Sequence, residues 1–183
     1  MKNLLLIIDY QYDFVADDGL LTAGKSAQYI ENNIYNLANS YIKNNDDIIF
    51  TLDTHITKDW SLHPESKSFN IHCEKNTQGH MPYGKTLQIL NYKNTSILEK
   101  KAYAPLIEDI NKIITNYNSI ELCGVVTDIC VLQTAISLYN ASANIDKNIL
   151  FKVNANACAS FNNDNHIFAI NYMKNILGFK ISQ

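Results

Sequence analysis

Cys130 is the residue of this chain whose type and position most suggest chemistry. It lies in the run Gly124–Val131 (GVVTDICV), between an apolar segment and the start of a predicted helix. A helix start carries backbone N–H groups without partners and the positive end of the helix dipole, and both favour the thiolate, the nucleophilic form of cysteine. The same N–H groups can hold an oxyanion. The turn therefore predicts a nucleophile beside a site for the negative charge that its attack creates.

Three more polar residues, Asp9, Asp53 and Lys100, each follow a short apolar segment. The carboxyl ends of parallel strands meet at one edge of a sheet, where ligands bind. Taken singly, Cys130 is typical of a buried thiol, Asp9 of a turn and Lys100 of a solvated lysine, and Lys101 could replace Lys100. Together, a nucleophile, an acid–base group and a cation that stabilises the thiolate are what attack on a carbonyl carbon requires.

A second group of ligand-type side chains begins at the end of the second predicted strand. Asp53 and His55 lie on the same side of an extended segment, and His63, Glu65 and His72 follow downstream. Carboxylate and imidazole ligands without paired thiolates suit Zn²⁺, Fe²⁺ or Mn²⁺ in an open site. The alternative is that Asp53 and His55 cap the strand and hydrogen-bond to each other, since no compact metal-binding spacing is present.

Short apolar runs and amphipathic stretches alternate along the chain, and these elements must position the polar residues. Strands are predicted at 4–8, 47–52, 96–99, 119–123, 148–153 and 179–181, and helices at 26–44, 105–117, 128–140 and 165–176. Ser26 and Asp128 are predicted helix N-caps. The segment 53–94 is too long for an ordinary connection and is predicted to be functional. The pattern indicates a single α/β domain over residues 1–183, a three-layer α/β/α arrangement with a mostly parallel central sheet.

The composition narrows the classes of partner. The formal net charge of -3 provides no basic surface for nucleic acid and no polybasic membrane patch. No apolar stretch reaches the length of a membrane span, and the four scattered cysteines are typical of free thiols in the cytoplasm. All 15 basic residues are lysines, so no arginine fork is available for a substrate with two carboxylates. A small-molecule substrate is expected, and a homo-oligomer is left open.

These motifs together resemble those of the isochorismatase-like cysteine hydrolases, and within them the nicotinamidases. The matching segments extend over nearly the whole chain: the opening strand and aspartate at 7–14, a glycine turn at 20–24, a lysine motif at 100–104 and the nucleophile turn at 124–131. The resemblance implies the isochorismatase-like fold and a catalytic triad of Asp9, Lys100 and Cys130. In the family, the peptide bond between the residues matching Val125 and Val126 is cis, which places the N–H of Val126 in an oxyanion hole beside that of Cys130.

The segment 53–73 resembles the metal-binding segment that separates nicotinamidases from their metal-free relatives. The resemblance implies one divalent metal ion, with zinc as the first choice and iron or manganese as alternatives. The best match makes the ligands Asp53, His55, Glu65 and His72. A variant would use His63 in place of Glu65. Many nicotinamidases have a tryptophan where this chain has Thr54, and Trp60 is a candidate to replace it.

The activity that the resemblance implies is hydrolysis of nicotinamide to nicotinate and ammonia through a cysteine thioester, as part of NAD salvage. The metal would bind the pyridine nitrogen, and Phe14, Phe69 and Tyr103 would pack on the ring, although each is also typical of an aromatic core residue. The alternatives are a metal-free amidase acting on a ureido or carbamoyl substrate and, in another class, a non-catalytic binding protein on the same fold.

Overall fold

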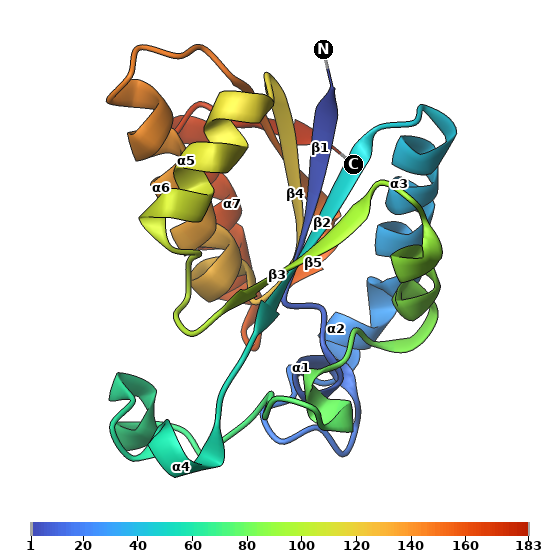
Figure 1. Cartoon of the computed structure of the whole chain (residues 1–183), viewed down its shortest axis with the longest axis vertical. Helices are drawn as coiled ribbons and strands as arrows, with labels where there is room; N and C mark the ends of the chain where they lie inside the picture. The colour runs from blue at the N-terminus through green and yellow to red at the C-terminus, as the bar shows by residue number, and fades with distance from the viewer. Residues whose placement is uncertain (1, 183) are drawn as a thin grey trace.

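Six parallel strands form the central sheet of this protein, whose computed structural model describes residues 2–182 (Figure 1). In chain order they are β1 (Asn3–Ile8), β2 (Asp47–Asp53), β3 (Thr95–Lys100), β4 (Ser119–Val125), β5 (Leu150–Ala159) and β6 (Lys180–Ser182). The spatial order is β3-β2-β1-β4-β5-β6, so β1 lies near the middle. Leu4 to Ile8 are fully buried, because helices cover both faces of such a sheet.

Helices cover the sheet on both sides, which confirms the predicted three-layer α/β fold. They are α1 (Tyr12–Val15), α2 (Lys25–Tyr29), α3 (Glu31–Lys43), α4 (Thr57–Trp60), α5 (Ile107–Asn116), α6 (Leu132–Ala143) and α7 (Asn163–Asn175). Helices α5, α6 and α7 lie on one side and α3 on the other, while α4 extends beyond the end of β2 (Figure 1). None of the helices in the described part of the chain is long and apolar enough to cross a membrane.

The helix predicted at 26–44 is two helices. The helical segment is interrupted at Ile30 (φ −84°, ψ −5°), which ends α2 and precedes α3. Apolar residues keep their helical spacing across Ile30, so the sequence pattern alone could not predict this interruption. The prediction of Ser26 as an N-cap is also wrong, because Gly24 precedes α2 and Ser26 lies inside it. The Ser26 hydroxyl instead donates hydrogen bonds to the carbonyls of Ala23 and Ser160, at 2.9 and 3.0 Å.

The strand predicted at 148–153 continues to Ala159. Its second half pairs with β4 after a register shift, and Gly124 then lies opposite Cys158. The Asn154 side chain accepts a hydrogen bond from the N–H of Ala157 at 3.0 Å, within this irregular stretch. Two asparagines in the segment suggest a turn, whereas pairing with β4 keeps it extended.

Gly124 lets the ends of β1 and β4 approach each other closely. Its φ is +117°, and a Cβ atom there would lie 2.0 Å from the carbonyl oxygen of Ile8. Only glycine adopts this conformation and fits this space. The result is that Asp9, which follows Ile8, lies beside the turn that carries Cys130.

Candidate active site

The structure brings together the three residues predicted as a triad, at the carboxyl ends of β1, β3 and β4. The ammonium Nζ of Lys100 lies 2.6 Å from Asp9 Oδ2 and 3.9 Å from Cys130 Sγ. It also lies 3.7 Å from Asp53 Oδ1, so the lysine stands between the triad and the second group of carboxylate and imidazole side chains. All four side chains are buried, which strengthens these electrostatic interactions.

Asp9 and Lys100 are held by groups that the sequence analysis did not identify. The Thr51 hydroxyl donates to Asp9 Oδ1 at 2.7 Å, and the N–H of Asp9 donates to the carbonyl of Thr51 at 3.1 Å. Lys100 Nζ donates to the carbonyl of Ala102 at 2.9 Å. The one feature of the sequence that could have indicated a role for Thr51 is that it is a polar residue within the apolar run of β2.

Burial controls the protonation states of the triad. It raises the pKa of the Cys130 thiol well above its usual value, and Lys100 only partly opposes this. Burial also raises the pKa of Asp9, although Lys100 and the hydrogen bond from Thr51 favour its carboxylate. Burial alone would lower the pKa of Lys100, but the negative charge of Asp9 and its other neighbours raises it.

The resting form of Cys130 is therefore a thiol beside a charged lysine. The dipoles of the helix start favour the thiolate, as expected from the sequence, whereas removal of water from around the sulfur opposes them and raises the pKa of the thiol. A base must then take the proton of the thiol before the sulfur can attack.

Cys130 lies in one wide helical turn, Thr127–Val131, that leads into α6. The N–H of Val131 reaches back to the carbonyl of Val126 at 3.2 Å, an i to i+5 bond of the π type, which is often found at functional sites. The peptide bond between Val125 and Val126 is cis, as the resemblance implied.

Asp128 does not cap this turn, contrary to the prediction. Its carboxylate accepts hydrogen bonds from the Ser160 hydroxyl at 2.5 Å and from Asn165 Nδ2 at 3.1 Å. Its neighbour Thr127 is hydrogen-bonded to His166 Nδ1 at 2.9 Å. Both side chains thus tie the nucleophile turn to the end of β5 and the start of α7.

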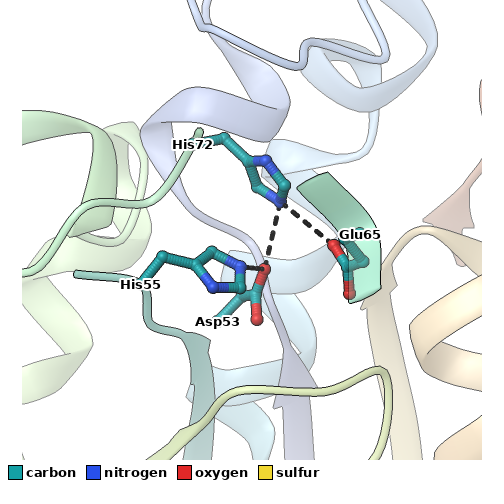
Figure 2. A group of neighbouring side chains, drawn as sticks. All are labelled: Asp53, His55, Glu65 and His72. Atoms are coloured by element: carbon teal, nitrogen blue, oxygen red, sulfur yellow. Dashed lines mark hydrogen bonds and ion pairs between the residues drawn. The ribbon is translucent and has the colours of Figure 1, made fainter. Parts of the chain in front are cut away.

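Figure 2 shows the second cluster, in which Asp53, His55, Glu65 and His72 point toward one another. One potential ligand atom from each lies within 4.8 Å of the others. Asp53 Oδ2 is 2.9 Å from His55 Nε2 and 3.3 Å from His72 Nε2, and Glu65 Oε2 is 3.7 Å from His72 Nε2. The hydrogen bonds from the two histidines and the charge of Lys100 overcome the effect of burial and lower the pKa of Asp53, so this carboxylate is charged.

The surroundings of the cluster fit a cation. The hydrogen bond between His72 Nδ1 and the carbonyl of Asn70, at 2.9 Å, orients the ring so that Nε2 points into the cluster, the arrangement typical of metal ligands. Asp53 Oδ1 is buried and accepts no hydrogen bond from any residue in the range 2–182.

His63 lies outside this group, because both of its ring nitrogens are used elsewhere. Nε2 donates to the carbonyl of Lys101 at 2.6 Å, and Nδ1 accepts from the N–H of Glu65 at 3.3 Å. Trp60 stacks on His63 with the ring centres 5.3 Å apart and packs edge-on against His55 at 4.6 Å. A tryptophan therefore does contact the cluster, although Thr54 occupies the position next to His55.

One cavity joins the two clusters. It is lined by residues of both, Asp53, Glu65, His72, Val126 and Cys130, and by the three predicted aromatic residues, Phe14, Phe69 and Tyr103. Leu21, Ile129 and Phe161 complete the wall, and none of the three was predicted from the sequence. No motif marks these apolar residues, because their place in the wall depends on how distant segments pack. Phe14 and Phe69 also contact the His72 ring, with centres 5.4 and 6.3 Å apart.

Comparisons with known proteins agree with this arrangement. The family described as "Isochorismatase domain" matches residues 3–182. An isochorismatase family protein of Bacillus subtilis (strain 168), PncA, is 35% identical over 190 residues, covering 100% of both chains. The solved structure of nicotinamidase/pyrazinamidase PncA from Bacillus subtilis is 33% identical with a TM-score of 0.89, covering 100% of both chains. That of pyrazinamidase/nicotinamidase from Streptococcus mutans UA159 is 39% identical with a TM-score of 0.89, covering 99% of this chain and 100% of the other.

Proposed function

This chain belongs to the isochorismatase family, and from that premise we propose that it is a nicotinamidase, which converts nicotinamide and water to nicotinate and ammonia. The observation that carries the proposal is the shared cavity, in which Cys130 lies with the Asp53–His72 cluster. A nucleophile and a group that can hold an aromatic nitrogen are the two things that a pyridine carboxamide requires. Relatives described as nicotinamidases, at 33% and 39% identity over nearly the full chain, support the same activity.

The candidate metal ligands are Asp53, His55, Glu65 and His72, which together offer two carboxylates and two imidazoles. This donor set suits Zn²⁺, with Fe²⁺ or Mn²⁺ as alternatives. When bound, the metal ion would act as a Lewis acid that coordinates the pyridine nitrogen and so orients the ring. Phe14, Phe69 and Tyr103 provide apolar walls for the faces and edges of that ring.

The first half of the reaction forms a thioester. Asp9 takes the proton of the Cys130 thiol, and Lys100, which stays charged, stabilises the thiolate. The sulfur attacks the carboxamide carbon, and the N–H groups of Val126 and Cys130 hold the oxyanion. The carbon–nitrogen bond then breaks, and the proton on Asp9 passes to the nitrogen, which leaves as ammonia.

The second half hydrolyses the thioester. Asp9, again a carboxylate, takes a proton from a water molecule as the oxygen attacks the thioester carbon. The same backbone N–H groups hold the second oxyanion. The carbon–sulfur bond breaks, and the proton on Asp9 returns to Cys130. The carboxylic acid formed loses its remaining proton to solvent and leaves as nicotinate. One carboxylate thus acts twice as a base and twice as an acid in each turnover.

The test is ammonia release from nicotinamide by purified protein whose metal content has been measured. We expect turnover by the wild type and almost none by Cys130→Ala, because members of a catalytic unit fail together. Ammonia from a ureido or carbamoyl substrate but not from nicotinamide would indicate the metal-free amidase instead. No turnover of any of these substrates would favour a non-catalytic binding protein.

The proposal also includes the cellular compartment in which the reaction takes place and the kind of substrate. Four buried cysteines, all free, suit the reducing cytoplasm, where the nicotinate produced would re-enter NAD synthesis. The substrate is a small neutral amide, consistent with a chain that has no arginine to bind two carboxylates.

A further inference from the structure

Phe161 is unlike the other residues that line the catalytic cavity. Of the eleven lining residues, Phe161 is the one that is exposed, with 44% of its surface accessible. The same side chain also lines a neighbouring cavity, together with Ser26, Ser160 and His166. Phe161 therefore lies on the boundary that the two spaces share, and we call its side chain the partition.

The catalytic cavity is too small for a substrate ring. Its volume is about 20 Å³, whereas the neighbouring cavity has about 360 Å³. A single water molecule needs roughly 10–15 Å³ measured in this way, so part of the wall must move before an aromatic amide can enter. Phe14, His72, Val126 and Cys130 are buried and packed, and moving them would disturb the core. The half-exposed ring of Phe161 can turn at far lower cost.

The main chain on both sides of Phe161 is held in place. Before it, the Ser160 carbonyl accepts a hydrogen bond from the Ser26 hydroxyl at 3.0 Å, and the Ser160 hydroxyl donates to Asp128 in the nucleophile turn. After it, Asn162 caps α7, and its side chain accepts from the N–H groups of Asp164 and Asn165 at 2.7 and 3.2 Å. The motion available to Phe161 is therefore rotation of its side chain, and the partition returns to one place after each opening.

We propose that Phe161 is the specificity-determining residue of the catalytic cavity. Its ring turns aside to admit the substrate and then closes the cavity off from the neighbouring space, which limits the substrate to the carboxamide of a single, unsubstituted six-membered ring. The inference rests on the proposed function, since it assumes that an aromatic amide enters this cavity. Without the ring of Phe161 the two cavities join, and the joined space, with the polar side chains of Ser26, Ser160 and His166, can accept a ring substituent.

The test compares wild type, Phe161→Ala, Phe161→Leu and a matched control, Phe168→Ala. Phe168 is a phenylalanine of α7, 61% exposed, that lines neither cavity. Each protein is assayed for ammonia release from nicotinamide and from nicotinamides that carry a methyl or phenyl group at ring carbon 4, 5 or 6. The measured quantity is kcat/KM for each substituted amide relative to kcat/KM for nicotinamide. Thermal unfolding of each variant accompanies the assays.

We expect Phe161→Ala to raise this ratio at least about tenfold for one or more substituted amides, a typical size for a change in an apolar pocket. Phe161→Leu should give a smaller rise, and Phe168→Ala none. An active wild type with the same ratio in a folded Phe161→Ala protein would overturn the role of Phe161 alone. A wild type that releases no ammonia from nicotinamide would overturn the proposed function, and the role of Phe161 with it.

Discussion

Gln11 holds the main chain of Asp53 at both its N–H and its carbonyl. The Oε1 atom of Gln11 accepts from the N–H of Asp53 at 2.8 Å, and its Nε2 atom donates to the Asp53 carbonyl at 2.9 Å and to the His80 carbonyl at 3.0 Å. Gln11 is fully buried and lies two residues after Asp9. The segment that carries Asp9, the proposed acid–base group, thus also positions Asp53, the first residue of the cluster of Asp53, His55, Glu65 and His72.

Gln11→Leu should therefore weaken metal retention. The leucine fills similar space but leaves the buried N–H and carbonyl of Asp53 without partners, at a cost of about 1–3 kcal/mol for each such group. Metal bound per chain after dialysis against a chelator, together with urea unfolding, measures both effects. Gln28→Leu is the control, because Gln28 donates to the carbonyl of Val15 and to Asp17, and to no residue of the cluster. Equal metal retention in the two variants would contradict the role of Gln11.

Thr51→Val should move the acid limb of the pH–rate profile to higher pH. The hydrogen bond from Thr51 favours the carboxylate form of Asp9 and so lowers its pKa, opposing the effect of burial. Without it the pKa of Asp9 rises further, and Asp9 becomes protonated, and unable to act as a base, at a higher pH. The profile of kcat/KM against pH gives the shift.

Thr134→Val is the matched control for this profile. Thr134 is fully buried in α6, and its hydroxyl has no hydrogen-bond partner among residues 2–182. The control variant should keep the acid limb of the wild type. An acid limb that stays in place in Thr51→Val would show that Asp9 is not the group titrating there.

His72→Ala and His63→Ala should differ in metal content. His72 Nε2 faces Asp53 and Glu65, so its loss removes one of four candidate ligands and should abolish stoichiometric metal and turnover. Both ring nitrogens of His63 are bonded to main-chain groups, of Lys101 and Glu65, rather than to the candidate ligand atoms, so His63→Ala should keep its metal. Elemental analysis of the purified variants decides the matter. Equal loss in the two variants would make His63 a ligand.

Asp128→Ala should lower kcat more than it changes KM. The carboxylate joins the turn that carries Cys130 to Ser160 and Asn165, so its loss lets Cys130 move relative to Lys100. The hydrogen bond from the Ser26 hydroxyl to the Ser160 carbonyl remains and still holds the wall at Phe161. A fall in kcat of about tenfold is the expected scale for a small misplacement of the nucleophile. Asp128→Asn can still pair with both partners and should restore most of the rate. Steady-state kinetics of both variants test this, and equal rates in the alanine and asparagine variants would argue against a positioning role.

Most of the site could be predicted because its polar residues stand directly after apolar runs. Asp9 and Asp53 were found by that local signal, the choice of Lys100 over Lys101 came from the family resemblance, and parallel pairing does bring the three to one edge. Thr51, Gln11 and Phe161 escaped detection. Their roles depend on partners 42 residues away for the two polar side chains, and on packing between β5, α7 and the cavity for Phe161. The predictions of Ser26 and Asp128 as N-caps were wrong because these side chains hydrogen-bond to residues distant in the sequence instead of to backbone N–H groups of their own helices.

The sequence by itself determined the order of elements, the α/β class and the residue types that meet at the ends of the strands. These follow from hydrophobic period and from polar residues that end strands, both of which are local properties. Only the tertiary structure showed that burial raises the pKa of the Cys130 thiol, that the Glu65 carboxylate lies within the cluster while His63 does not, and that Phe161 borders two cavities. Burial, ring orientation and cavity shape arise from segments far apart in the chain, and no local pattern encodes them.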